Sequence, residues 1–275
     1  MEAIAEIKTD SAAGPDAIPA VLLKNCASSV ALPLRLLWQR SFDLGLVPQI
    51  YKESLVCPLY KKGDRAKAIN YRPVSLTSHI IKVFERVLRK IMARFIEKNG
   101  LISENQHGFR SGRSCLTQIL AHYDDIYNGF INNEDTDSIY LDYAKAFDKV
   151  DHRLLILKLK RYSFHPNLVK WIESFLSNRF QRVIVGNAQS YKAPILSGVP
   201  QGTVLGPILF IIFINDLESR IEHSVVRFFA DDTRVSKRIT EEKDTVELQQ
   251  DLEVVMKWSS ESNMVQHEQE FEVLN

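Results

Sequence analysis

The chain has 275 residues, of which 45 % are hydrophobic and 25 % are charged, and its formal net charge is +1. This composition is typical of a globular protein with a sizeable core, and it excludes wholesale disorder. The three cysteines are widely spaced and form no CxxC pair, which argues against a zinc site and favours a reducing, intracellular setting.

Charge is distributed unevenly along the sequence. Residues 1–120 carry 18 Lys and Arg against 10 Asp and Glu, residues 121–238 carry 15 against 14, and residues 239–275 carry 2 against 10. The basic first part suits a nucleic-acid backbone or a triphosphate, although a solvated helix surface is the commoner explanation of such charge.

Periodicity and turn residues predict interleaved helices and strands. The first part of the chain should form a helical stretch that opens at Gly14 and ends at Gly45 to Pro48, a strand (54–60), two turns (61–64 and 70–73), a basic amphipathic helix (80–96), a loop (108–113) and a helix (115–130). The middle part should form a strand (138–142), two helices (154–159 and 166–176), two strands (181–185 and 190–195) and a Gly/Pro loop (197–202). The last part should form an apolar helix (204–214), a hairpin (225–230 and 234–239) and an acidic helix (246–259). This irregular order favours an α+β fold over a doubly wound sheet.

The apolar helix at residues 204–214 has no charged residue. It is well short of the roughly 20 residues needed to cross a bilayer. We therefore expect a buried core helix and no membrane partner.

Three acidic residues are candidates for catalysis. Asp142 follows a short apolar strand, where an isolated Asp is most often a capping residue. Asp231 and Asp232 are adjacent at the tip of the expected hairpin, where Asp-Gly or Asn-Gly would fit a turn more easily, so their gathered charge indicates a cation. If the fold brings the three together, they could hold two Mg²⁺ ions about 3.5–4 Å apart.

Two further segments could bind phosphate groups. The loop that contains Gln201 and Gly202 runs into the apolar helix, whose N-terminus favours anions, but the loop lacks the GK[ST] ending of a P-loop and is as readily a helix-entry loop. Lys61 and Lys62, with Arg72, could neutralise a triphosphate, although a surface lysine pair is the commoner case.

Taken together and in order, six segments resemble the reverse transcriptase family, and most of all its non-LTR (LINE-type) retrotransposon branch. The segments are GPDAIP (14–19), NYRPVSL (70–76), QHGFR (106–110), LDYAKAFDKVDH (141–152), SGVPQGTVLGPILF (197–210) and FADD (229–232). An isolated Asp-Asp pair carries no weight, whereas six ordered blocks cover nearly the whole chain. The resemblance implies a right-hand polymerase with fingers and an antiparallel palm sheet backed by helices, in which residues 1–137 are mainly fingers and residues 138–275 mainly palm, with 155–200 partly returning to the fingers.

The resemblance also implies roles for individual residues. Asp142, Asp231 and Asp232 would bind two Mg²⁺ ions, with Mn²⁺ as the alternative. Phe147 would supply a ring that excludes ribonucleotides, and Tyr143, Gln201 and Gly202 would contact the nucleotide. Arg72 and either Lys61 or Lys62 would contact the triphosphate. Arg110, Phe229 and Ala230 would contact the template or primer.

Two departures from the family pattern bear on activity. Glu270 stands where the family usually has a lysine that helps the pyrophosphate to leave, and the chain is expected to stop before its thumb. Despite these departures, the resemblance implies an RNA-directed DNA polymerase that uses an RNA template, a DNA primer and dNTPs, in the cytoplasm and nucleus. The alternatives are a degenerate copy that folds and binds nucleic acid without polymerising, and a structural or adaptor protein.

Overall fold

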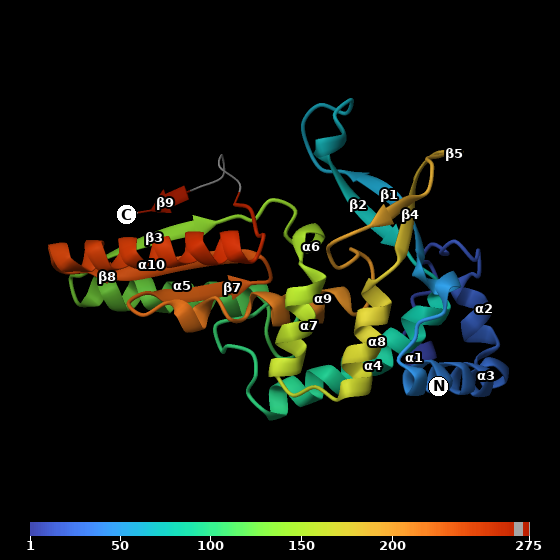
Figure 1. Ribbon diagram of the computed structural model, residues 1–275. Helices are drawn as coiled ribbons and strands as arrows, with labels where there is room; N and C mark the ends of the chain where they lie inside the picture. The colour runs from blue at the N-terminus through green and yellow to red at the C-terminus, as the bar shows by residue number, and fades with distance from the viewer. Residues whose placement is uncertain (267–271, 275) are drawn as a thin grey trace. The chain divides into compact units, whose positions relative to one another are not determined.

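The computed structural model describes residues 1–266 and 272–274 (Figure 1). The backbone forms two compact units, each made from two stretches of the chain: residues 1–92 with 156–206, and residues 93–155 with 207–275. Residues 155–200 fall almost wholly in the first unit, whereas residues 93–137 belong to the second. Two compact units do not by themselves correspond to the fingers and the palm, so the expected division of the chain between these two subdomains stays a prediction.

The first unit contains a sheet with the strand order β2-β1-β4-β5, in which β6 also pairs with β4. Strand β1 is antiparallel to β2 and parallel to β4. The strands are β1 (Glu53–Tyr60), β2 (Tyr71–Leu76), β4 (Arg179–Val185), β5 (Ala188–Gln189) and β6 (Ala193–Ile195). The predicted turn at residues 70–73 is therefore wrong beyond Asn70. Pro73 lies opposite Pro58 in the ladder, and a proline is tolerated there because β2 is an edge strand.

Helices pack around an aromatic core in this unit. They are α1 (Glu2–Ala5), α2 (Ala20–Asn25), α3 (Ala27–Leu44) and α8 (Pro166–Leu176), with the short 3₁₀ helices η1 (Gln49–Lys52) and η2 (Ala68–Asn70). Phe84 stacks on Trp38 at 5.1 Å between ring centroids and meets Trp171 edge-on at 5.2 Å. The expected helical start at Gly14 is wrong, because residues 14–19 precede the first turn of α2.

Helices α4 (His79–Lys98) and α7 (His152–Arg161) each have residues in both units. In α4 the buried positions Ile81, Leu88 and Met92 recur at helical spacing, as the sequence predicted for residues 80–96.

The second unit contains a wholly antiparallel sheet with the order β7-β8-β3-β9. The strands are β3 (Asp135–Leu141), β7 (Val225–Phe229), β8 (Asp232–Ile239) and β9 (Glu272–Leu274). Residues 233–236 are buried in succession, so both faces of β8 are covered, since neighbouring side chains of a strand point to opposite faces. The predicted antiparallel sheet is confirmed.

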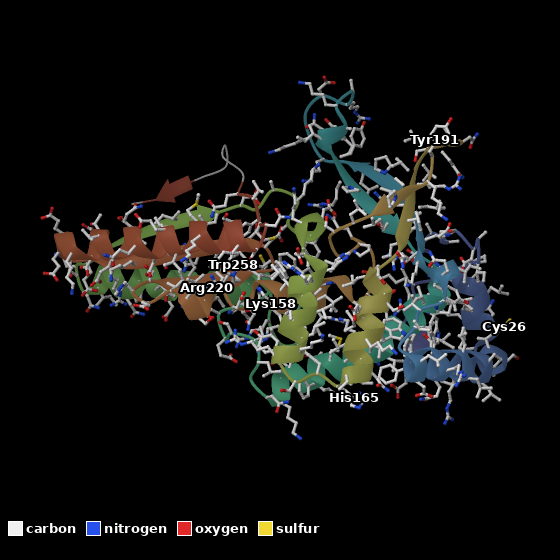
Figure 2. All side chains as sticks on the ribbon, in the orientation of Figure 1. Cys26, Lys158, His165, Tyr191, Arg220 and Trp258 are labelled. Atoms are coloured by element: carbon white, nitrogen blue, oxygen red, sulfur yellow. The ribbon has the colours of Figure 1, made fainter. Side chains whose placement is uncertain are left out.

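Two long helices pack on this sheet, α5 (Cys115–Ile131) and α10 (Glu242–Glu261). The chain also forms α6 (Ala146–Lys149), α9 (Gly206–Ile214) and the short η3 (Glu218–Arg220). Helix α10 packs against β8, and α5 packs against β3 and β7. Trp258 of α10 is fully buried and donates to Asp216 Oδ1 at 3.1 Å (Figure 2).

The apolar helix α9 lies in the core, as predicted. Seven consecutive residues from Ile208 to Ile214 are at most 4 % exposed. Within the part of the chain that the structure describes, no helix is both long and apolar enough to cross a membrane.

Candidate active site

Strand pairing brings the three candidate acids to one end of the second unit's sheet. In the antiparallel ladder between β3 and β8, Leu141 lies opposite Thr233. The next pair of positions in that register is Asp142 and Asp232. Asp231 lies in the turn between β7 and β8. The fold therefore brings to one sheet end Asp142 and Asp232, which are 232 − 142 = 90 residues apart in the sequence.

The donors suit a hard divalent cation, which prefers carboxylate oxygens. Asp142 and Asp231 are half-buried, and Asp232 is the most accessible of the three. Even so, partial loss of hydration raises the pKa of Asp232, and a nearby cation would offset that cost. Among residues 1–266 and 272–274, however, no three His, Cys, Asp or Glu side chains are gathered as a group that could hold a metal ion. The acids fit a metal in chemistry and backbone placement, and their side chains would have to converge to bind it.

The residues before these acids are held tightly. Ala230 is only 5 % exposed and has a left-handed backbone with φ of 59°, while Phe229 is half-buried. A template or primer contact by Ala230 would therefore have to use its backbone.

Phe147 lies in an aromatic cluster near the start of α6. Its ring stacks on Phe210 of α9, with centroids 4.4 Å apart and planes 15° apart, and it meets Phe109 edge-on at 6.2 Å. Phe147 is half-buried, so part of the ring stays accessible. This geometry is compatible with the predicted role in excluding a 2′-hydroxyl.

Tyr143 does not offer its side chain to a nucleotide. It is 2 % exposed and meets Trp258 edge-on at 6.1 Å, and burial raises the pKa of its hydroxyl. Tyr143 is two residues beyond Leu141, the last residue of β3, and both are buried, whereas Asp142 between them is half-buried, as expected where neighbouring side chains point to opposite faces. The side chain of Tyr143 belongs to the core, and a nucleotide contact by this residue stays a prediction.

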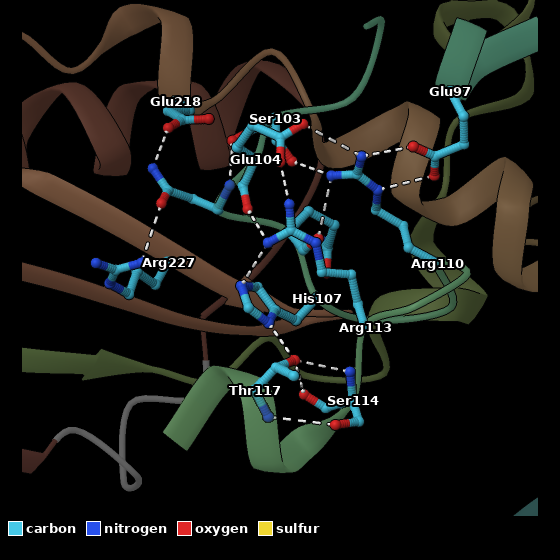
Figure 3. Close-up of polar contacts among 12 residues, drawn as sticks. Glu97, Ser103, Glu104, His107, Arg110, Arg113, Ser114, Thr117, Glu218 and Arg227 are labelled. Atoms are coloured by element: carbon cyan, nitrogen blue, oxygen red, sulfur yellow. Dashed lines mark hydrogen bonds and ion pairs between the residues drawn. The ribbon is translucent and has the colours of Figure 1, made fainter. Parts of the chain in front are cut away.

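Arg110 is engaged within the protein (Figure 3). Its guanidinium donates to both carboxylate oxygens of Glu97, at 3.0 and 2.7 Å, and to the Ser103 carbonyl at 2.6 Å. The side chain is 5 % exposed. A template contact by Arg110 stays a prediction, while the structure gives the side chain a different role: it fixes the end of α4 to the loop that follows.

The predicted nucleotide loop lies in the first unit, against β2. The Ser75 amide donates to the Gln201 carbonyl at 2.7 Å. Gly202 has φ of +110°, and a Cβ there would collide with the Ser75 carbonyl. Only glycine permits this approach, so the backbones of the NYRPVSL and SGVPQG segments pack directly against each other.

Lys61, Lys62 and Arg72 are exposed on the β1–β2 hairpin. The hairpin is closed by the Lys61 amide, which donates to the Asn70 carbonyl at 2.9 Å, and by the Tyr60 hydroxyl, which donates to the Gly63 carbonyl at 2.6 Å. The hairpin therefore holds the positively charged side chains of Lys61, Lys62 and Arg72 at the surface on an ordered backbone, an arrangement that suits binding of a triphosphate.

Comparison with known proteins agrees with these features. Residues 60–270 match the family described as reverse transcriptase (RNA-dependent DNA polymerase). The chain belongs to the reverse transcriptase family. It is 31 % identical over 255 residues to the probable RNA-directed DNA polymerase from transposon X-element of Drosophila melanogaster, and 29 % identical over 273 residues to that from mobile element jockey of the same organism.

These matches cover 91 % and 95 % of the chain, and 28 % and 29 % of the relatives, so the chain spans about three tenths of their length. A solved structure of apo telomerase from Candida tropicalis, truncated from its C-terminal domain, has the same fold with a TM-score of 0.60 at 11 % identity, covering 90 % of this chain and 55 % of that one. The resemblance to non-LTR retrotransposon reverse transcriptases and the mixed α and β fold are thus confirmed.

Two residues of this reverse transcriptase chain were missed as site residues by the sequence reasoning. Glu85 is fully buried, and its Oε2 accepts from the Val204 and Leu205 amides, at 2.7 and 3.0 Å, just before α9. Gln106, in the QHGFR segment, is bound to the backbone of Ala230. Glu85 could have been noticed as an acid on the apolar face of a predicted helix. Glu270, predicted to stand at the lysine position, lies outside the described residues.

Proposed function

We propose that this chain is the polymerase core of an RNA-directed DNA polymerase, which adds deoxynucleotides to a primer 3′ end by two-metal phosphoryl transfer. The observation that supports the proposal is the β3–β8 register, which ends at Leu141 opposite Thr233, so that Asp142 and Asp232 are the next residues of the two strands. Three acids at one sheet end repel one another unless a cation lies between them.

In the proposed reaction the primer 3′-oxygen attacks the α-phosphorus of a dNTP. A new P–O bond forms, the bond to the bridging oxygen breaks, and pyrophosphate leaves. Two Mg²⁺ ions bound by Asp142, Asp231 and Asp232 would supply activation of the attacking oxygen and stabilisation of the leaving oxygen, and Mn²⁺ could substitute.

The other residues orient the substrates. Arg72, with Lys61 or Lys62, neutralises the triphosphate, and the loop of Gln201 and Gly202 lines the nucleotide pocket. Phe147 crowds a ribose 2′-hydroxyl and so favours deoxynucleotides. The RNA template is held largely through its backbone.

Primer extension on an RNA template with Mg²⁺ and dNTPs tests the proposal. We expect extension by the wild type and none by the Asp231→Asn/Asp232→Asn double variant. Asp135→Asn is the matched control, because Asp135 is an exposed acid at the other end of β3. Extension by the double variant, or equal loss in the control, would contradict the assignment of the acids.

A second candidate function is template binding without chemistry. It is favoured by the acid side chains, which are not gathered into a three-ligand group among the described residues. Salt-sensitive RNA binding by the wild type and the double variant, with extension by neither, would establish it and overturn the polymerase proposal.

A further inference from the structure

The segment before α5 lies directly along the strand that leads into the acidic turn. Residues Asn105 and His107 bracket Phe228 of β7: the Phe228 amide donates to the Asn105 carbonyl, and the His107 amide donates to the Phe228 carbonyl, both at 2.9 Å. Gln106 thereby forms a parallel bridge with Phe228. Its side chain, 2 % exposed, is confined beside the end of β7.

The side-chain amide of Gln106 binds both backbone polar groups of Ala230. Its Oε1 accepts from the Ala230 amide at 2.9 Å and from the Gly108 amide at 2.7 Å. Its Nε2 donates to the Ala230 carbonyl at 3.3 Å. A single buried side chain thus joins the QHGFR segment to the residue that immediately precedes Asp231.

The two segments are in close contact as well as hydrogen-bonded. A Cβ at Gly108 would lie 2.9 Å from the Ala230 Cα and closer still to its amide nitrogen, so only a glycine fits at this position. Ala230 itself has φ of 59°, a conformation that is unfavourable for a non-glycine residue and persists when its surroundings fix it. Gln106 supplies such fixation.

The direction of Asp231 and Asp232 depends on this conformation. Rotation about the Ala230 backbone would redirect the two carboxylates that follow it, while Asp142, on the neighbouring strand, would stay in place. A catalytic constellation has to be held within about 0.5 Å of its productive geometry. The side chain that fixes Ala230 is therefore placed to fix the acidic site.

We propose that Gln106 is a positioning residue for the acidic turn: its amide holds Ala230 in the left-handed conformation that sets the direction of Asp231 and Asp232 at the sheet end where Asp142 lies. The inference rests on the proposed function in that these acids bind the catalytic metal. Gln106 touches neither substrate nor metal in this account, and it acts through the Ala230 backbone.

Amide hydrogen exchange on the full chain, without metal or substrate, tests the clamp itself. In Gln106→Met, which keeps the side-chain length and removes the amide, we expect faster exchange at the Gly108 and Ala230 amides and unchanged protection elsewhere in β7 and β8. In Gln106→Glu, which keeps an acceptor oxygen, we expect protection of both amides to be retained. Wild-type protection of both amides in Gln106→Met would overturn the clamp. If Gln106→Met loses protection throughout the chain, Gln106→Glu becomes the decisive variant. Loss of protection at the Gly108 and Ala230 amides alone in Gln106→Glu would then overturn the clamp.

Binding of Mn²⁺ alone, followed by electron paramagnetic resonance, tests the effect on the acids. We expect Gln106→Met to weaken Mn²⁺ binding by about 10- to 100-fold, as loss of an outer-shell partner does at metal sites. Gln118→Met is the matched control, since Gln118 is a half-buried glutamine of the same unit with no hydrogen bond to its side-chain oxygen. Unchanged Mn²⁺ affinity in Gln106→Met, or equal weakening in the control, would overturn the positioning role.

The two experiments separate this inference from the proposed function. If Asp231→Asn/Asp232→Asn binds Mn²⁺ as tightly as the wild type, the metal assignment fails whatever Gln106 does. If the double variant loses Mn²⁺ and Gln106→Met does not, the polymerase proposal stands and the positioning role fails. With an active wild type, the expected kinetic signature of Gln106→Met is a lower kcat and a higher Mg²⁺ requirement, with the KM for dNTP unchanged.

Discussion

Arg110 illustrates why a single side chain cannot be assigned from a motif alone. An arginine in a basic, loop-rich segment suggests a nucleic-acid contact, but here the guanidinium is paired with Glu97 and two carbonyls of the loop, those of Ser103 and Gln106. The pairing joins residues 13 positions apart and leaves the side chain 5 % exposed. The structure therefore makes stability, rather than template affinity, the property that should depend on Arg110.

We expect Arg110→Ala to lower the free energy of unfolding by about 2–4 kcal/mol, because it removes charge-assisted bonds to a mostly buried group. Denaturant titration measures this effect. Arg113→Ala is the control, since its ion pair with the exposed Glu104 is expected to contribute about 0–1 kcal/mol. If Arg110 serves stability alone, the template affinity of folded Arg110→Ala should equal that of the wild type, and a lower affinity would support the predicted template contact.

Phe147 leads to a second prediction at this scale. Its ring is held by Phe210 on one face and by the edge of Phe109. Phe147→Val should lower the preference for dNTP over rNTP by about 10-fold or more, since it opens space for a hydroxyl. Phe109→Ala should lower it by less, because the stacking on Phe210 remains. The ratio of kcat/KM values for the two nucleotides measures both effects, and an unchanged ratio in Phe147→Val would contradict the gate.

Among the elements, α4 and the start of α9 are joined by the buried carboxylate of Glu85. Its Oε2 accepts the amides of Val204 and Leu205, which would otherwise lack partners inside the protein. Burial raises the pKa of this carboxyl, and the two amides and the charge of Arg179 oppose the rise only in part. The pKa of Arg179 is itself lowered to about 10 by burial.

This shift predicts a pH dependence with a definite sign. Above the ordinary pKa of 4.5, the unfolded chain releases the Glu85 proton while the folded chain still keeps it, so the stabilising contribution falls as pH rises. The contribution of Glu85 to stability is fully present below pH 4.5, and it decreases as the pH rises from 4.5 to the folded-state pKa of this carboxyl. Relative to Glu85→Gln, which does not titrate, the wild type should lose about 1.4 kcal/mol per pH unit in that window. Denaturant unfolding from pH 4 to pH 8 measures the difference, and a flat difference would contradict the shift.

Element types were largely readable from the sequence, and their exceptions have physical causes. The short apolar run of 54–60, which ends at a polar turn, and the helical spacing of 166–176 predict β1 and α8 closely. Residues 70–73 looked like a turn because of Asn70 and Pro73, but hydrogen bonding to β1 outweighs the local preference. The hairpin was predicted, whereas the left-handed conformation of Ala230 was not, because alanine rarely adopts it.

At the scale of the whole molecule, the ordered motifs were sufficient to predict the family and the antiparallel sheet. They could not reveal Glu85 or Gln106 as supports, because these contacts join residues 119 to 124 positions apart. Nor could they show that Tyr143 faces the core, since a strand end leaves the direction of its side chain open. Motifs record which residue types recur, and only the folded chain shows which backbone groups they bind.

The uneven charge of the molecule gives a last prediction. If Lys61 and Lys62 contact the triphosphate, Lys61→Ala/Lys62→Ala should raise the KM for dNTP by about tenfold or more, through loss of charge-assisted contacts. The salt dependence of RNA binding should then stay as in the wild type. Lys98→Ala, at the exposed end of α4, is the control and should change neither quantity. A salt slope reduced by about 0.7 per lysine would place these side chains on the template instead.

The short strand β9 also bears on solubility. It pairs with residues 138–140 of β3, so it covers the edge of the sheet that lies opposite β7. An uncovered β3 would expose a row of backbone donors and acceptors, to which a strand of another molecule could add. Proteolytic removal of β9 should therefore uncover the backbone of residues 138–140 and promote edge-to-edge association between molecules, so this three-residue strand protects the sheet edge.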